Sequence, residues 1–287
     1  TLLAFAEGRK NSCSDTGDVD LVYKKSFDNG KSWSDLQVIW DDGMNTCGNP
    51  SPVLDLESGR LSLLSTWNRG EDKEWQIIDQ KSIDTRHVFL IHSNDNGKTW
   101  SKPKEITNDV KLDNWTWYAT GPVNGIQLKN GKNKGRLIIP CDHIEAETKH
   151  YYSHIIYSDD GGLNWNLGGS TPQHQVNECT VIEFKNGDLL LNMRNYTDDR
   201  LRKLERGSLA GDPEATEALL NAQRRLGMYE HGHFVVRPFF EILSAGGQRD
   251  NLHRFYFNFE LHYIVAVSCH DFACSIEFIT ELYISMS

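Results

Sequence analysis

The chain has 287 residues, of which 38% are hydrophobic, 24% are charged and 23 are glycine, a composition that suits a globular domain of short strands and tight turns. A formal net charge of −10 argues against a nucleic-acid partner, because phosphate binding needs a basic surface. No apolar run approaches the length of a membrane span, and the six cysteines have neither the CxxC spacing of a zinc site nor the density of a disulfide framework.

An eight-residue motif occurs three times along the chain, each time after a short β-like run (LVYKK, HVFLIH and HIIY). The copies are Ser26–Trp33, Ser93–Trp100 and Ser158–Trp165, and successive copies start 67 and then 65 residues apart. Asp in the third position can accept backbone N–H bonds, and Gly in the fifth permits a positive φ. Trp in the eighth position can bury its ring against a sheet. We therefore predict three hairpin turns, each with an aromatic anchor.

A second pattern of strand, Gly-containing turn and strand alternates with these turns. It begins at Val53, Ile126 and Val181. Each unit of about 65 residues thus holds several short strands. Such a unit is typical of a β-propeller blade, because blades arranged around an axis leave few exposed sheet edges.

The repeat ends and the predicted secondary structure changes after about residue 199. No further copy of the motif occurs in the last 88 residues, and we predict helices over 200–210 and 212–227. The second has Asp212 as N-cap, Pro213 in its first turn and Gly227 as its stop signal. Residues 234–284 are rich in aromatic and β-branched types and suggest strands. We interpret this tail as foreign to the repeat, through a frameshift, a chimeric assembly or a fusion.

The repeated turns and the segments between them resemble the sialidase (exo-α-neuraminidase) family, in which the turns are called Asp boxes. The resemblance covers about residues 1–198. The matching stretches are LLAFAEGR (2–9), SDTGDVDLVYKKSFDNGKSW (14–33), GNPSPV (48–53), GIQL (125–128), GRLIIPC (135–141) and NECTVIEF with GDLLLNMRNY (177–196). The resemblance implies an all-β fold: a partial six-bladed β-propeller of about three blades, each a four-stranded antiparallel sheet, with a helical or irregular tail.

The resemblance also implies a chemistry, the release of terminal sialic acid from sialylated glycans with retention of configuration. In this family three arginines hold the substrate carboxylate, a Tyr assisted by a Glu is the nucleophile, and an Asp is the acid/base. No metal or organic cofactor is expected. Hydrolase and trans-sialidase use the same residues, so both remain open. The family favours a secreted or periplasmic location, although no signal-peptide pattern precedes Thr1.

Two candidate residues lie in the first matching segment. Asp15 matches the acid/base and Arg9 matches a substrate-binding arginine beside it. Glu7 and Asn49 are secondary candidates, because their segments approach the same site in the family. Two other interpretations of Asp15 are a turn-forming aspartate and, with nearby Asp18 and Asp20, a calcium ligand; the spacing lacks the Gly and Glu of an EF-hand loop.

Two more candidates lie on a predicted hairpin. Glu178 matches the Glu that activates the nucleophile, and Arg194 matches a second carboxylate-binding arginine. If Lys185–Gly187 is a three-residue loop with Gly187 left-handed, Phe184 pairs with Asp188 and Glu178 falls opposite Arg194. A two-residue turn would place them on different faces of the hairpin. The catalytic interpretation therefore predicts the three-residue loop, whereas the alternative for this pair is a structural ion pair.

The remaining catalytic residues of the family are not identifiable by motif. The first arginine belongs to an R-I-P segment that lies upstream of LLAFAEGR in the family, and the third arginine and the tyrosine belong to later blades. We therefore expect about half of the catalytic residues in this chain. Two alternatives to an active enzyme follow: an inactive or sialic-acid-binding propeller fragment, and an Asp-box propeller that serves protein–protein contact.

Overall fold

The computed structural model describes residues 1–172 and 174–196, with short stretches at 213, 229–230, 233–234 and 264–266. The chain divides into two compact units, residues 1–193 with 247–287, and residues 194–246. The predicted helices over 200–227 and most of the strands predicted over 234–284 lie outside the described residues. The first unit, up to residue 193, contains the predicted repeats.

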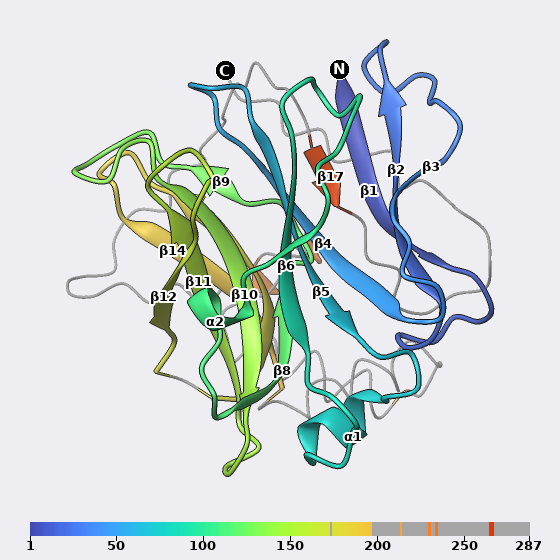
Figure 1. The fold of residues 1–287 in the computed structure, drawn as a ribbon. Coiled ribbons are helices and arrows are strands. Elements are labelled where there is room, and N and C mark those ends of the chain that lie inside the picture. The colour runs from blue at the N-terminus through green and yellow to red at the C-terminus, as the bar shows by residue number, and fades with distance from the viewer. Residues whose placement is uncertain (173, 197–212, 214–228, 231–232, 235–263, 267–287) are drawn as a thin grey trace. The chain divides into compact units, whose positions relative to one another are not determined.

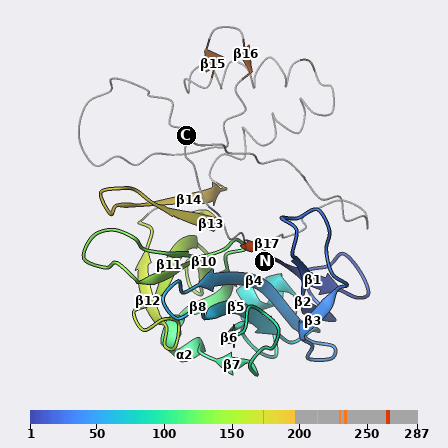
Figure 2. The ribbon, with the colours of Figure 1, turned by 90° about the horizontal axis from the view of Figure 1, so that it is seen from above.

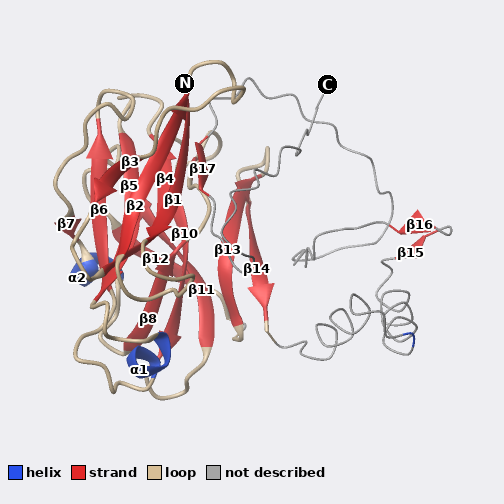
Figure 3. Ribbon diagram, turned by 90° about the vertical axis from the view of Figure 1, so that its right-hand side faces the viewer, coloured by secondary structure: helices blue, strands red, loops and turns tan. Residues whose placement is uncertain are grey.

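The described part of the chain is almost entirely β-structure, with two short helices (Figure 3). Its strands are β1 (Leu2–Arg9), β2 (Val19–Ser26), β3 (Gln37–Trp40), β4 (Thr46–Leu54), β5 (Leu61–Asn68), β6 (His87–Ser93), β7 (Lys104–Glu105), β8 (Trp115–Thr120), β9 (Ile126–Gln127), β10 (Leu137–Glu145), β11 (Tyr151–Ser158), β12 (Asn166–Ser170), β13 (Val176–Glu183), β14 (Leu189–Asn195), β15 (Tyr229–Glu230), β16 (His233–Phe234) and β17 (Ile264–Ala266). The helices are α1 (Glu74–Ile78), between β5 and β6, and α2 (Thr107–Val110), after β7.

The strands form successive blades in chain order (Figure 1). The second blade is β4-β5-β6-β7 and the third is β8-β10-β11-β12, both antiparallel, with β9 paired to β10. The first blade has β1, β2 and β3 in antiparallel order, and β17 lies parallel to β1 on its other edge. The hairpin β13–β14 follows the third blade, and Figure 2 shows it beside β10 and β11. The prediction of about three four-stranded propeller blades is confirmed.

Apolar side chains fill the spaces between neighbouring blades. One cluster joins the first and second blades through Phe5, Leu21 and Leu63, and another joins the second and third through Leu64 and Ile139. All five residues are buried. Strands β2, β5 and β10 are buried along almost their whole length, because they are covered on both faces.

The three Asp boxes have one geometry. In the second, Ser93 Oγ accepts a hydrogen bond from Gly97 N (2.8 Å), Asp95 Oδ1 accepts one from Thr99 N (2.9 Å), and Gly97 has φ 75°. The first and third boxes repeat the serine and aspartate bonds with their own residues. The predicted Asx-type turn with a left-handed glycine is therefore confirmed in all three copies.

Each of the later Asp boxes also packs on the preceding blade. Tyr23 in the first blade donates its hydroxyl to the carbonyl of Gly97 (2.9 Å), and the Trp100 ring stands edge-on to Phe5 (5.7 Å between centroids). Trp165 of the third box is buried in the cluster between the second and third blades. The boxes therefore join blades together in addition to closing their own turns.

The Asp boxes lie at one end of the blades. In the first blade Leu2 pairs with Ser26, where the box begins, whereas Arg9 pairs with Val19 at the other end. The second and third blades have the same polarity, with Ser93 and Ser158 at the Asp-box end. The loop that carries Asp15 is therefore at the opposite end, which we call the site end.

Candidate functional site

Arg9, the last residue of β1, binds two carboxylates at the site end. Its Nη2 lies 2.8 Å from Glu7 Oε2 and 2.6 Å from Asp15 Oδ1, and its Nη1 donates to the carbonyl of Cys13 (2.7 Å). Burial lowers the pKa of the guanidinium, but the bonds to Glu7 and the charge of Asp15 more than offset this, so the pKa is raised. The structure thus brings Arg9 and Asp15 into contact.

Ion pairs of Arg9 and Lys10 anchor the loop that carries Asp15, while Asp15 itself remains accessible. The Asp15 side chain is 44% exposed, compared with 15% for Arg9. Lys10 Nζ lies within 3.2 Å of the carboxylates of Asp18, Asp20 and Asp41. Since Asp15 binds Arg9 while Asp18 and Asp20 bind Lys10, the three acids do not converge as calcium ligands would.

Asn49 joins three blades immediately beside this cluster. Its backbone N–H donates to Glu7 Oε1 (2.8 Å), its Oδ1 accepts from Thr66 Oγ1 (2.8 Å), and its carbonyl accepts from Thr120 Oγ1 (2.5 Å). The β4–β5 register shifts between Gly48 and Ser51, and Asn49 has φ 51°. This bulge turns the backbone N–H away from the β-ladder and towards Glu7.

Arg86 is a residue at the site that the sequence analysis did not single out. It precedes β6 and is 3% exposed, with its guanidinium carbon 3.8 Å from the centre of the Trp117 ring. Nε donates to Asn68 Oδ1 (3.2 Å) and Nη1 to the carbonyl of Tyr118 (3.3 Å). Arg86 lies in no motif (its context is Asp-Thr-Arg-His), so no sequence signal marked it.

Glu178 lies on β13, at the site end of the next blade. Its neighbour Asn177 accepts a hydrogen bond from Ser153 Oγ (2.5 Å), and Cys179 N donates to the carbonyl of Gly121 (3.4 Å). The Glu178 side chain is half-buried. Glu178 and the Arg9–Asp15 pair therefore come from different blades but from the same end of their strands.

The loop between β13 and β14 has the predicted form. Phe184 N donates to the carbonyl of Asp188 (2.8 Å), Gly187 N donates to the carbonyl of Phe184 (2.9 Å), and Gly187 has φ 87°. The prediction of a three-residue loop is confirmed. That Arg194 stands opposite Glu178 stays a prediction; Arg194 is exposed, with its guanidinium carbon 5.0 Å from the centre of the Tyr196 ring.

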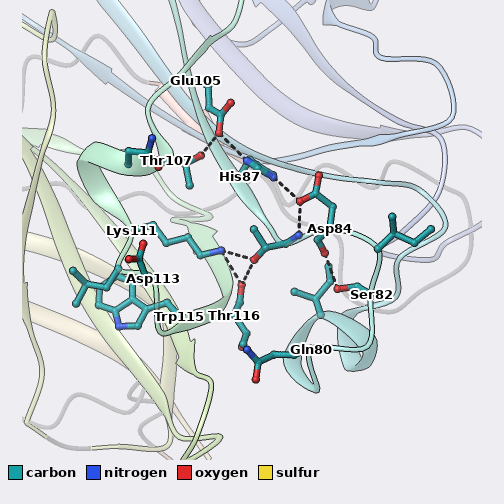
Figure 4. Close-up of a pocket in the computed structure, with 15 residues that line it drawn as sticks. Gln80, Ser82, Asp84, His87, Glu105, Thr107, Lys111, Asp113, Trp115 and Thr116 are labelled. Atoms are coloured by element: carbon teal, nitrogen blue, oxygen red, sulfur yellow. Dashed lines mark hydrogen bonds and ion pairs between the residues drawn. The ribbon is translucent and has the colours of Figure 1, made fainter.

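A cavity of about 450 Å³ opens between the second and third blades (Figure 4). His87 spans it, with Nε2 3.0 Å from Asp84 and Nδ1 2.7 Å from Glu105. Lys111 Nζ donates to Thr85 Oγ1 (2.8 Å) and to the carbonyls of Arg86 (2.7 Å) and Thr116 (3.0 Å). None of the residues predicted for the site lines this cavity, but Lys111 connects it to the backbone of Arg86.

Among the residues that the structure describes, no group of three or more His, Cys, Asp or Glu side chains is arranged to hold a metal ion. Among the same residues, no helix has the length and apolarity needed to cross a membrane.

The chain is similar in sequence to one protein family and to curated relatives. The BNR repeat-like domain family matches residues 1–208. An exo-alpha-sialidase from Aspergillus fumigatus is 39% identical over 230 residues, which are 73% of this chain and 52% of the relative. An exo-alpha-sialidase from Arthroderma benhamiae is 32% identical over 75% of this chain and 53% of its own length. The chain thus spans about half the length of these curated relatives.

Solved structures have the same fold. A Hadza microbial sialidase, Hz136, superposes with a TM-score of 0.60 and 25% identity, covering 67% of this chain and 41% of that one. Trypanosoma rangeli sialidase in complex with sialic acid has a TM-score of 0.53 at 19% identity, covering 67% of this chain and 33% of that one. The second likeness concerns the fold alone.

Proposed function

Because the chain belongs to the sialidase family through its BNR repeat-like domain, we propose that it acts as an exo-α-sialidase, releasing terminal sialic acid from glycans with retention of configuration. The observation that carries the proposal is the contact between Arg9 and Asp15 at the site end of the blades. It joins a fixed cation to an accessible carboxylate in a loop, the combination that binding an acidic sugar and transferring a proton requires.

Asp15 is the proposed acid/base. Its 44% exposure leaves the carboxylate open to a glycosidic oxygen and then to water, so it can donate a proton to the leaving group and later activate a water molecule. Arg9 holds it from the buried side and takes part in substrate binding. Glu7 fixes Arg9 in turn, since the Arg9 Nε and Nη2 atoms both bond to Glu7 Oε2.

Glu178 is proposed to draw the proton from a tyrosine nucleophile, and Arg194 to bind the substrate carboxylate. The three-residue loop supports this assignment, because an unbroken ladder continued from it along β13 and β14 would put Arg194 opposite Glu178. The guanidinium can bind a carboxylate with two parallel bonds and stays charged at any working pH.

The direct test is hydrolysis of a fluorogenic sialoside by the full chain. We expect Asp15→Asn and Glu178→Gln each to lower kcat by roughly 10²- to 10⁴-fold, the range that one acid/base group contributes. Asp35→Asn and Glu57→Gln are matched controls, because both side chains are exposed and outside the site. Turnover that survives both site substitutions would refute the assignment.

Binding separates the proposal from its alternatives. If the unsubstituted chain does not turn over the sialoside but still binds sialic acid, and Arg194→Met abolishes that binding, a sialic-acid-binding module is favoured. Loss of all glycan binding in a folded chain favours an Asp-box propeller for protein contact. Isothermal titration with free sialic acid distinguishes the two.

A further inference from the structure

Arg86 is a buried cation whose own hydrogen bonds do not neutralise it. The two hydrogen-bond acceptors of its guanidinium are both uncharged: the side-chain amide of Asn68 and the carbonyl of Tyr118. Its planar face lies on Trp117 and its carbonyl is held by Lys111. A buried charge is costly unless opposite charges lie near it. The positive charge of Arg86 must therefore be balanced by carboxylates that do not hydrogen-bond to it.

Carboxylates from four separate elements act electrostatically on Arg86. Burial lowers the pKa of its guanidinium, and the opposing charges are, in decreasing order, Glu7 on β1, Glu74 on α1, Asp142 on β10 and Asp15 in the β1–β2 loop. Two of the four, Glu7 and Asp15, are the carboxylates that Arg9 binds. A second cation, Lys111, lies on the backbone side of Arg86 and donates a hydrogen bond to its carbonyl.

The side chains of Arg86 and Glu7 both approach Gly48. A Cβ at Gly48 would lie 2.8 Å from Glu7 Oε1 and 3.6 Å from Arg86 Nη2, so both atoms face the same point of β4. The same Glu7 oxygen accepts the N–H of Asn49 (2.8 Å), while the other oxygen binds Arg9. Glu7 is thus held between a backbone donor, Arg9 and the field of Arg86.

We propose that Arg86 is a positioning residue for the Asp15 site: its buried charge holds Glu7 against Gly48 and Asn49, and Glu7 then fixes Arg9 and Asp15. The inference rests on the proposed function for the role of Asp15, but the coupling of Arg86 to Glu7 is independent of it. Arg86 acts through Glu7 and Arg9, so it need not touch substrate.

Kinetics of Arg86→Met and Arg86→Lys test the effect on catalysis. With a fluorogenic sialoside, we expect Arg86→Met to lower kcat roughly 10- to 100-fold, as small misplacements of a catalytic group do, with a much smaller change in KM. The pH–rate profile should also change, because the substitution removes a positive charge from beside the Glu7–Arg9–Asp15 cluster. Arg86→Lys keeps the charge and should recover part of kcat and of the pH profile.

Arg136→Met is the matched control. Arg136 also stacks on an aromatic ring (4.1 Å from Tyr157) and binds a carboxylate, Asp159, but it lies at the Asp-box end. Its loss should leave kcat and the pH profile unchanged. If Arg86→Met and Arg86→Lys keep the unsubstituted kcat and pH profile while only the Tm falls, Arg86 is structural and the inference is wrong.

A double-mutant cycle tests the coupling without any activity. Arg86→Met should lower the Tm less in a Glu7→Gln background than in the unsubstituted chain, because the amide no longer needs a cation. Additive effects on Tm would contradict the coupling. If the unsubstituted chain hydrolyses no sialoside, the proposed function fails while this cycle still decides the coupling. Should Arg86→Met not fold, Arg86→Gln, which also removes the charge, serves in both measurements.

Discussion

At the scale of single residues, some contacts at the site end are local in sequence and others depend on tertiary packing. Arg9 and Asp15 are close in sequence, so their pairing follows from a short loop. Asn49 was a secondary candidate, but its role depends on a bulge in β4, and a bulge has no reliable sequence signature. Arg86 immediately precedes β6 of the second blade, and only tertiary packing brings it to the site.

Gly48 provides a prediction at this scale. Gly48→Ala would place a methyl group 2.8 Å from Glu7 Oε1, so Glu7 must move away from Asn49 N and Arg9. We expect kcat on a fluorogenic sialoside to fall roughly 10-fold or more, as it does when a positioning group is displaced. Gly169→Ala is the control, since no atom lies within 4 Å of its Cβ position. Equal activity of the two variants would show that Glu7 does not position Arg9.

At the scale of elements, local rules predicted the turns well. The Asp boxes and the three-residue β13–β14 loop both depend on residues a few positions apart, so their geometry could be inferred from the order of Ser, Asp and Gly. Strand pairing between distant segments could not. The parallel contact of β1 with β17 joins Leu3 to Ile264, and no pattern in either strand specifies that pairing.

The Asp-box serine gives a prediction about stability. Ser93→Ala removes the acceptor of the Gly97 N–H, which is buried, and also a donor to Asp95. A buried N–H without an acceptor costs roughly 1–3 kcal/mol, so the free energy of unfolding should fall by about that amount. Urea denaturation followed by tryptophan fluorescence measures it, with the exposed Ser170→Ala as control. A change no larger than that of the control would mean that water replaces the serine.

At the scale of the whole molecule, the repeat of about 65 residues was sufficient to predict a propeller, because each unit supplies one blade. The interiors between blades hold polar groups that composition alone does not reveal. His143 and His154 lie side by side there, with their Nδ1 atoms 3.0 Å apart and the His143 ring stacked on Trp115 (3.4 Å between centroids). Both histidines are buried.

This pair predicts how stability depends on pH. Burial lowers the pKa of His143 to about 3, and burial together with the charge of His143 lowers that of His154. An unfolded histidine titrates near 6.5, so between pH 6.5 and about 3 the unfolded chain binds more protons. Stability contributed by the pair should therefore be present above pH 6.5 and decline as the pH falls through this window.

Thermal unfolding between pH 7.5 and 4 measures the effect. The doubly substituted His143→Gln, His154→Gln chain should have a flatter dependence of Tm on pH, whatever its absolute Tm. The Asp boxes add a separate loss at lower pH, since bonds from Ser32 lower the pKa of Asp28 to about 2 from its ordinary 3.8. An unchanged slope between pH 6.5 and 4 in the double variant would show that other groups control acid sensitivity.

The separation of the Asp-box end from the site end determines how this protein should be immobilised. Lys98 is exposed within the second Asp box, so an anchor attached there would leave Asp15 pointing away from a sensor surface. Thiol chemistry would do the opposite: the exposed Cys13 is two residues from Asp15, and an anchor on its sulfur would turn the site end towards the support. The residue chosen for attachment would then decide whether a surface-bound preparation can meet a glycan.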